Sequence, residues 1–449
     1  MKKNFVIIFL FAVLLASCLI LTSCHKHEVS EWTEIYDLTC VRAGTGIGFC
    51  ECGEQITKEI QPIGHQYVNK VCSVCGDLEG SYGLQIEIDG SYASVVGIGT
   101  CTDTDIIIPS TYITDDNKFL EVNRISSLAF ENCTNIKTII IPDSVSTISS
   151  DAFEGCSIER ATIPADVCGA IKNNNLKEIV ITGKSYFPSY IHSEALSGCI
   201  NLEKVIIGEY VTSIGSDAFS GCINLEKVII GENVNSINSG AFANCSSLKN
   251  ISIPSGVTYI NGATFSGCTS LSDIVIPENV TVIGYSAFRG CSSLSSVTIP
   301  NGVTSIESWA FSDCSNLSRI TIPESVTNIG NYAFKNCNSI TDITIPGGVT
   351  RLGVDFFHGC TGLKYVTIGE GVTSIASSAF QYCVSLERVI IPSSVTTIGG
   401  YAFKACANLT IYCEAQSKPE GWDALWNWHE DKRFLEVVWG FKGELNNNE

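Results

Sequence analysis

Basic residues and histidines are scarce in this sequence. Its 449 residues include 27 Lys and Arg against 46 Asp and Glu, which gives a formal net charge of −19. A charge of this sign opposes binding to phosphate backbones and to anionic lipid headgroups. The composition therefore argues against nucleic acid as a partner. With 45% hydrophobic residues the chain can bury a large core, and its length predicts several domains or a repeat array.

The histidines offer no catalytic arrangement. Two lie close to the N-terminus, one lies among cysteines, and the others are singletons, so no Ser, His and Asp constellation can be argued from their spacing. They are His25, His27, His65, His192, His358 and His429. The sequence also lacks a His-Glu-x-x-His motif and a phosphate-binding glycine loop. We therefore predict no catalytic residues and no catalytic cofactor, and hence a protein that is not an enzyme.

The N-terminus has the order of a secretory signal. Lys2 and Lys3 precede an apolar run over 5–21, which ends in Leu-Thr-Ser-Cys at 21–24 and is followed by polar residues. Leu-Thr-Ser-Cys resembles a bacterial lipobox, which implies cleavage before Cys24 and lipid attachment to it. We expect a signal peptide over 1–23, a tether over 24–36 and a membrane anchor that holds the protein in the cell envelope, at the cell surface.

Two alternatives to this anchor stay open. Cys18 ends a second candidate lipobox, but cleavage there would leave apolar residues where a polar tether is expected. An uncleaved transmembrane helix is the other, although the run is barely long enough to span a bilayer. No other segment of the sequence could span one.

Residues 37–79 form a small module rich in cysteine. Its members are Cys40, Cys50, Cys52, Cys72 and Cys75, with His65 between them. Two knuckles, 50–52 and 72–75, each bring two sulfurs together before a glycine, and two knuckles make a tetrahedral metal site. The module is similar to zinc-ribbon-like units, which implies a structural zinc held by Cys50, Cys52, Cys72 and Cys75.

This zinc assignment has rivals. The first knuckle has one spacer residue where the ribbon pattern has two, so Cys40 and His65 are possible substitute ligands. Disulfides are the alternative to zinc in an oxidising compartment. A catalytic metal is disfavoured because four sulfurs would leave no open coordination position.

A 23-residue repeat occupies 80–413. Ala-Phe-x-x-Cys appears at Phe130 and Phe153, and the same phase returns at intervals of 23 residues, each time followed by Cys, at Leu196, Phe219, Phe242, Phe265, Phe288, Phe311, Phe334, Phe357, Phe380 and Phe403. A unit of this length has no core of its own and must stack on its neighbours. The array is therefore a solenoid with a continuous apolar interior. We expect the repeating cysteines to be buried core residues, with disulfides between some coils as the alternative.

The unit at 294–314 predicts the local structure of a coil. Apolar and polar residues alternate, so Val297 and Ile299 should face inward on a strand that Pro300 ends. A turn and a second buried edge with Ile306 follow. The segment around Phe311 should close the coil as one helical or 3₁₀ turn.

The Leu-x-x-Val-x-Ile-Pro, Val-Thr-x-Ile-Gly and Ala-Phe-x-x-Cys phrases together resemble the BspA-like branch of the leucine-rich repeats. This resemblance implies an α/β leucine-rich-repeat solenoid over 80–413, and contact with host matrix proteins or other bacteria. The interval from Cys156 to Leu196 departs from the period. Residues 414–449 hold four of the six tryptophans and should cap the open end of the core, with sugar stacking as the alternative.

The outward positions of the strands predict a wide, shallow binding face. Its best candidates are Lys204, Lys227, Arg319, Tyr365 and Arg388. Such a face suits an extended extracellular protein or a glycan better than a small molecule. We therefore expect a monomeric surface lipoprotein that serves adhesion or interaction. The alternatives are a structural spacer of the cell envelope, a glycan-capturing lipoprotein and, for each candidate, an ordinary solvated strand residue.

Overall fold

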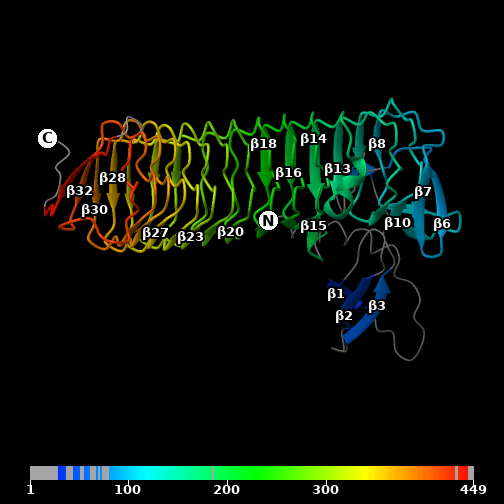
Figure 1. Ribbon diagram of the computed structural model, residues 1–449. Coiled ribbons are helices and arrows are strands. Elements are labelled where there is room, and N and C mark those ends of the chain that lie inside the picture. Colours follow the sequence, from blue (N-terminus) through cyan, green and yellow to red (C-terminus); the bar gives the residue numbers. More distant parts are fainter. Residues whose placement is uncertain are drawn as a thin grey trace.

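The computed structural model describes residues 80–184, 187–429 and 433–442, and the backbone of five strands before residue 80. Those strands are β1 (Val29–Tyr36), β2 (Gly44–Cys50), β3 (Gln55–Ile60), β4 (Tyr67–Val68) and β5 (Val71–Cys72). β1, β2 and β3 form an antiparallel sheet, and β4 pairs with β5. The remaining strands belong to one elongated stack of coils (Figure 1).

Each regular coil crosses the stack twice. The first strands lie along one side and pair in parallel with their neighbours. They are β8 (Asp105–Ile107), β11 (Thr138–Ile140), β13 (Arg160–Pro164), β14 (Glu178–Thr182), β16 (Lys204–Ile207), β18 (Lys227–Ile230), β22 (Ser296–Thr298), β24 (Arg319–Thr321), β26 (Asp342–Ile345), β28 (Tyr365–Ile368), β30 (Arg388–Ile391), β32 (Thr410–Cys413) and β33 (Glu436–Trp439). Single parallel bridges at Asn250, Ser252 and Val275 continue this side between β18 and β22.

The second strands form another side of the stack. They are β7 (Tyr92–Gly97), β10 (Phe119–Ile125), β12 (Thr147–Ile148), β15 (Ser189–Ile191), β17 (Val211–Ile214), β19 (Ser236–Ile237), β20 (Tyr259–Ile260), β21 (Val282–Ile283), β23 (Ser305–Ile306), β25 (Asn328–Ile329), β27 (Arg351–Leu352), β29 (Ser374–Ile375) and β31 (Thr397–Ile398). At the N-terminal end of the stack, β6 (Gln85–Asp89) pairs antiparallel with β7, and β9 (Thr111–Ile113) pairs antiparallel with β10.

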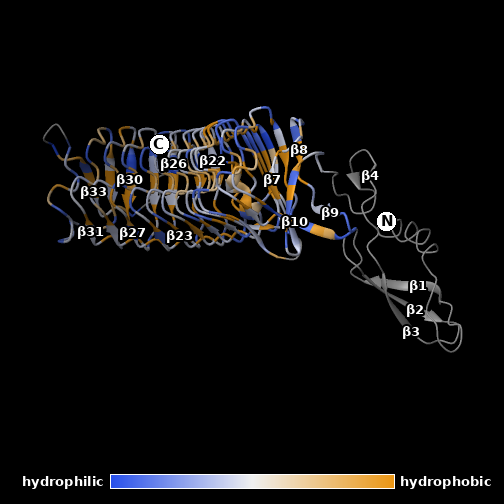
Figure 2. Ribbon diagram, turned by 90° about the vertical axis from the view of Figure 1, so that its right-hand side faces the viewer, coloured by the Kyte–Doolittle hydropathy of each residue, from blue (hydrophilic) through white to orange (hydrophobic). Residues whose placement is uncertain are grey.

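The predicted alternation along the first strands is confirmed. Val297 and Ile299 are each 4% exposed, whereas Thr298 between them is exposed. Ile306 of β23 is fully buried, as the second edge requires. Hydrophobic and hydrophilic residues therefore mix within each coil (Figure 2), and the apolar ones form a single core along the stack.

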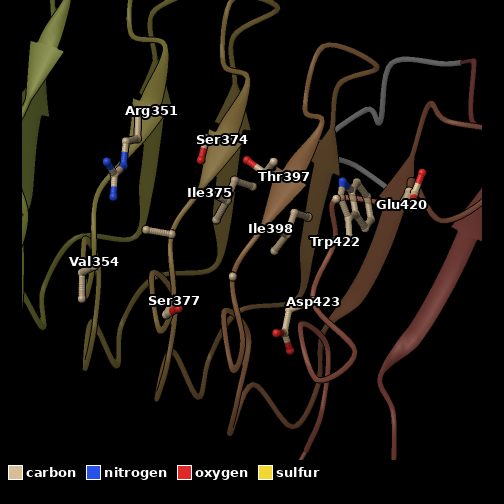
Figure 3. Close-up of a pocket in the computed structure, with 13 residues that line it drawn as sticks. Arg351, Val354, Ser374, Ile375, Ser377, Thr397, Ile398, Glu420, Trp422 and Asp423 are labelled. Carbon is tan, nitrogen blue, oxygen red and sulfur yellow. The ribbon is translucent and has the colours of Figure 1, made fainter.

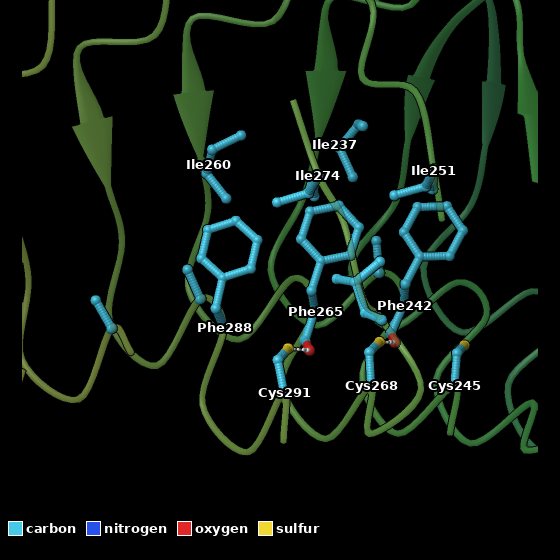
Figure 4. Close-up of a cluster of buried hydrophobic side chains, with 14 of the residues drawn as sticks. Ile237, Phe242, Cys245, Ile251, Ile260, Phe265, Cys268, Ile274, Phe288 and Cys291 are labelled. Atoms are coloured by element: carbon cyan, nitrogen blue, oxygen red, sulfur yellow. Dashed lines mark hydrogen bonds between the residues drawn. The ribbon is translucent and has the colours of Figure 1, made fainter. Parts of the chain in front are cut away.

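A ladder of stacked phenylalanine rings runs through this core. Phe242, Phe265 and Phe288 are fully buried, and their ring centroids lie 5.9 and 5.5 Å apart (Figure 4). The same near-parallel stacking continues from Phe288 to Phe403. Coil spacing is thus matched to ring packing, and each ring covers the face of the next.

From Cys156 onward the repeating cysteines are buried, as predicted, and most of them also make a hydrogen bond, whereas Cys133 is partly exposed. The thiol of Cys268 lies 3.1 Å from the carbonyl oxygen of Phe242 in the preceding coil, and Cys291 lies 3.2 Å from that of Phe265 (Figure 4). The same carbonyl of Phe242 also accepts the N–H of Cys245. Cysteine therefore fills a small core site and satisfies a second lone pair, which alanine or valine could not do. Every cysteine from Cys101 to Cys413 is free.

The α/β class and the helical turn are wrong for the described residues. The N–H groups of Trp309, Phe311 and Asp313 donate to carbonyls of the next coil at 3.0, 2.9 and 2.7 Å. Every second N–H group in this segment is therefore not hydrogen-bonded within a local helix. Trp309 and Asp313 also have φ of 63° and 62°. Residues in this left-handed region cannot continue a right-handed helix. The closing segment is therefore a chain of tight turns within a β-solenoid.

The departure from the 23-residue period coincides with a change of structure. Here a 3₁₀ helix, η1 (Ala165–Ile171), connects β13 to β14. It takes the place of a second strand in this coil, between the second strands β12 and β15 of the coils on either side. Cys168 of this helix is fully buried. The irregular coil therefore contains a helix in place of a strand, and the apolar side of this helix still packs into the common core.

At the C-terminal end of the stack, tryptophans lie against the last coil. Trp422 and Trp426 are each 3% exposed, and Trp426 meets the edge of Phe403, which ends the phenylalanine ladder. The Trp422 indole N–H donates to the carbonyl of Val395 at 3.2 Å. These two rings are buried against the core, so neither can offer a ring face to a sugar.

Candidate ligand-binding face

The outward side chains of the first strands form what we call the outer strand face, and it contains all five predicted binding residues. Lys204 of β16 and Lys227 of β18 are direct register partners in adjacent coils. The ammonium nitrogen of Lys204 lies 3.9 Å from a carboxylate oxygen of Glu178 in the coil before. The structure thus brings the two lysines together, as the repeat spacing predicts, with one of them beside a carboxylate.

Tyr365 of β28 and Arg388 of β30 form the second pair. They are register partners, and the guanidinium carbon of Arg388 lies 4.8 Å from the ring centroid of Tyr365. The Tyr365 hydroxyl donates to Glu387 at 3.0 Å, and this hydrogen bond to a carboxylate raises the pKa of Tyr365. The aromatic ring, the cation and the carboxylate hold one another in fixed positions at the surface.

Arg319 lies apart from both pairs. It begins β24, where its register partner is Ser296 of β22, and it is exposed. Tyr365 pairs on its other side with Asp342, which is also exposed. The five predicted residues therefore do not make a single cluster, but two pairs and one single cation spread along the same face.

Between the charged positions runs a row of small and β-branched side chains. Ile229 is 43% exposed and Val275 is 73% exposed. Threonines continue the row at Thr298, Thr321, Thr344 and Thr367. Exposed apolar side chains along one side of a parallel stack provide contact area that a partner can remove from water.

Ion pairs link neighbouring coils at the positions just before the first strands. Glu159 accepts Lys137 at 3.2 Å and Lys177 at 3.0 Å, and Lys249 lies 3.3 Å from Glu226. The hydrogen bond from Lys177, followed by that from Lys137, lowers the pKa of Glu159. Exposed pairs of this kind contribute little to stability, so their main effect is to fix the charge pattern beside the outer strand face.

A hollow of about 480 Å³ lies on the side of the second strands near the C-terminal end (Figure 3). Arg351, Ser374 and Thr397 follow one another along its length, and Glu420 and Asp423 close its far end. Its lining is mostly polar and open to solvent. It lacks the apolar enclosure that a small-molecule site needs.

Sequence reasoning missed a second group of partly exposed aromatic side chains, on the turns that contain the core phenylalanines. Trp309 and Tyr332 stack there with ring centroids 4.1 Å apart. Their signal was in the repeat, because each stands two residues before a core phenylalanine, as Tyr401 does. The outward strand positions alone do not include this row.

The lipid and zinc assignments fall outside the described side chains. Cys24, Cys40, Cys52, His65 and Cys75 lie outside the described residues, and only the backbone is described for Cys50 and Cys72. Those assignments stay predictions. Among the residues that the structure describes, no group of three or more His, Cys, Asp or Glu side chains is arranged to hold a metal ion. In the same part of the chain, no helix has the length and apolar character needed to cross a membrane.

Comparison with known proteins identifies the family. The model of the BspA type leucine rich repeat region matches at 117–179, 168–295 and 283–410, well over half of the chain. The chain therefore belongs to this family of leucine-rich-repeat proteins. No curated protein matches it significantly.

Several solved structures are similar. The chain is 28% identical to a leucine rich cell surface protein from Faecalibacterium prausnitzii, over 82% of this chain and 98% of that one, with a TM-score of 0.41. It is 21% identical to a leucine-rich repeat protein from Bacteroides ovatus, over 80% and 98%, with a TM-score of 0.45. It is 17% identical to the pneumococcal vaccine antigen PcpA, over 80% and 98%, with a TM-score of 0.44.

Proposed function

We propose that this chain is a non-catalytic protein of the bacterial cell surface that binds another protein through the outer strand face. The observation that carries the proposal is the exposure of Ile229 and Val275 on the outer strand face. The same face holds the charged register partners Lys204 and Lys227. A partner that covers these side chains removes apolar area from water. Membership of a repeat family that suggests interaction or adhesion agrees with this function.

The shape of the stack supports an extended partner. The face repeats its outward positions from coil to coil and is shallow, so it suits a protein segment that crosses many coils. Tyr365 with Arg388 provides the aromatic and guanidinium groups that are enriched at binding hot spots. We propose these two residues as the main anchor, with Lys204, Lys227 and Arg319 as charged contacts that orient the partner.

The N-terminus supplies the rest of the proposal. Lipid attached to Cys24 would hold the chain, as a monomer, in the cell envelope, and 24–36 would separate the anchor from the folded part. A structural zinc within 37–79 would stabilise the segment between tether and stack. The binding face would then be presented to extracellular proteins.

Binding of the full chain to immobilised extracellular matrix proteins, to cell surfaces and to a glycan panel tests the proposal. We expect saturable binding to a protein. Tyr365→Ala and Val275→Arg should each raise Kd by at least about ten-fold, because they remove an anchor or place a charge on the apolar row. Asn328→Arg adds the same charge to exposed β25 on the second strands and should leave Kd unchanged within about two-fold.

Three other outcomes would contradict parts of the proposal. Equal loss with Asn328→Arg and Val275→Arg would remove the outer strand face from the proposal. Saturable binding to glycans alone would replace the protein partner by a sugar. Folded protein that binds nothing on the panel would favour the structural spacer.

A further inference from the structure

The hollow on the side of the second strands carries a row of polar side chains, one from each coil that it crosses. Arg351 begins β27 and is the register partner of Ser374 in β29, which in turn pairs with Thr397 in β31. A parallel bridge from β31 to the last coil brings Glu420 next in the row (Figure 3). The row therefore reads cation, hydroxyl, hydroxyl, carboxylate along the stack.

Small residues line the hollow beside this row. Ala376, Gly399 and Gly421 belong to the lining, and none of them has a side chain long enough to fill the space. No larger residue fits at Gly399, because a Cβ there would collide with the backbone nitrogen of Ser377. The row is thus open to a ligand along its whole length.

The charged groups at the two ends of the hollow have capacity for a ligand. Arg351, Glu420 and Asp423 are the charged residues of the lining, and all three are exposed. Among the residues that the structure describes, no ion pair or side-chain hydrogen bond engages Arg351 or Glu420. Asp423 accepts the N–H of Leu425 at 2.7 Å with one carboxylate oxygen, which leaves the other oxygen for a ligand.

Nearby charges of opposite sign do not neutralise these ends. Asp355 follows Arg351 in the same coil, but it is held by Lys335 at 2.9 Å. Lys418 precedes Glu420, but it is exposed and does not belong to the lining. One end of the hollow therefore presents a cation, and the other presents carboxylates.

The distance between the charged ends matches an extended polypeptide. From Arg351 to Glu420 the row crosses three coil spacings of about 4.8 Å each, or about 14 Å in all. Four residues of an extended chain cover about 13–14 Å, and side chains at i, i+2 and i+4 point to the same side. A strand lying along the stack could place an acidic residue at Arg351, a small polar one at the hydroxyls and a basic one at the far end.

Other classes of ligand fit the hollow less well. A sugar needs an open ring face, but Trp422, the aromatic residue of the lining, is 3% exposed and already donates its N–H to Val395. A nucleic acid would bring phosphates toward Glu420 and Asp423. A polypeptide carries charges of both signs, and its amides can bond to the hydroxyls between them.

We propose that the hollow binds an extended polypeptide segment in which an acidic and a basic residue stand four positions apart, with a small polar residue midway. The acidic side chain meets Arg351, and the basic one meets Glu420 and Asp423. This site goes beyond the proposed function, because it is additional to the outer strand face, lies on another side of the stack and takes a ligand of stated charge pattern.

Fluorescence polarisation with short, end-blocked peptides and the full chain tests the proposal, at about 0.1 M salt so that distant charges are screened. The matched peptide is Thr-Lys-Thr-Ser-Thr-Glu-Thr with an uncharged dye. The shifted peptide, Thr-Lys-Thr-Ser-Thr-Thr-Glu, has the same composition, but its two charges point to opposite sides of an extended chain. We expect saturable binding of the matched peptide, at least about five-fold tighter than binding of the shifted one.

Two substitutions of Arg351 should change this preference. Arg351→Gln removes the cation and should bring the Kd values of the matched and shifted peptides within about two-fold of each other. Arg351→Glu makes both ends acidic, so it should weaken matched-peptide binding at least about ten-fold and favour Thr-Lys-Thr-Ser-Thr-Lys-Thr instead. Binding of that peptide would also show that the variant is folded.

The matched control is Lys364→Glu, which makes the same change of charge at an exposed lysine before β28, on the side of the first strands. It should keep the wild-type order of the peptides and change Kd by less than about two-fold. The proposal would be overturned by equal binding of matched and shifted peptides, by absence of saturable binding, or by an Arg351→Glu variant that keeps the wild-type preference. The same switch in Lys364→Glu would also overturn it.

The peptides separate this site from the outer strand face. Val275→Arg and Tyr365→Ala should leave matched-peptide binding unchanged within about two-fold, because neither residue lines the hollow. Matrix-protein binding without any peptide binding would remove the hollow alone. Peptide binding by a chain that binds no protein on the panel would remove the proposed function of the outer strand face alone.

Discussion

Replacing Phe265 by alanine should strongly destabilise the stack. The ring is fully buried and lies between Phe242 and Phe288, at centroid distances of 5.9 and 5.5 Å. A buried Phe→Ala change costs about 3–5 kcal/mol through lost transfer free energy and the cavity that remains. Two stacked contacts are lost with the ring, and each contributes about 0.5–1.5 kcal/mol, which places Phe265→Ala toward the upper end of that range.

Urea denaturation of the full chain, followed by circular dichroism, measures this loss. The matched control is Phe187→Ala, because Phe187 is 72% exposed and should change the free energy of unfolding by less than about 0.5 kcal/mol. Since each coil packs mainly against its two neighbours, faster amide exchange should be concentrated in the coils next to residue 265. A loss below about 1 kcal/mol, or one equal to that of Phe187→Ala, would refute the account of a sealed phenylalanine ladder.

Two further predictions concern the cysteine ladder and the turns. Burial raises the pKa of the Cys268 and Cys360 thiols to about 12 from a usual 9.0, so folded thiols stay protonated where unfolded ones ionise. The stability that these buried protonated thiols give to the fold is complete below pH 9 and is lost as pH rises toward 12, by about 1.4 kcal/mol per thiol and pH unit. Urea midpoints measured at pH 7, 9 and 10.5 should therefore fall steeply above pH 9. A flat profile would contradict this. Gly371→Ala should lower the melting temperature by several degrees, because the added Cβ would collide with the Gly347 carbonyl oxygen. The control is Gly347→Ala, whose added Cβ meets nothing closer than 3.8 Å. Equal melting temperatures of the two variants would be the contrary result.

The repeat period carried most of the fold prediction. Phe265 and its equivalents recur every 23 residues, and one ring per coil in a shared core is what such spacing requires. The inward direction of Val297 and Ile299 followed from period-two alternation. These features depend on residues within one coil and on strict stacking, so a single sequence contains them.

Features that depend on contacts between coils were harder to predict. The turn around Phe311 has the length of a helical turn. However, the N–H group of Phe311 donates a hydrogen bond to the next coil, and nearby residues at positive φ exclude a helix. The thiol of Cys268 meets a carbonyl 26 residues earlier, a pairing that the 23-residue spacing does not reveal. The arrangement of Trp309 between Arg289 and Tyr332 likewise depends on side-chain conformations in three coils.

Photo-crosslinking from the outer strand face can show whether a partner lies on this surface. Benzoylphenylalanine would replace Ile229, which is 43% exposed on β18, and in a control chain it would replace exposed Asn328 on β25. Both chains would be irradiated on the cell or matrix surface that binds the wild-type protein. A protein partner should be captured from position 229 and not from 328. Capture from 328 alone, or from neither position while binding persists, would contradict it.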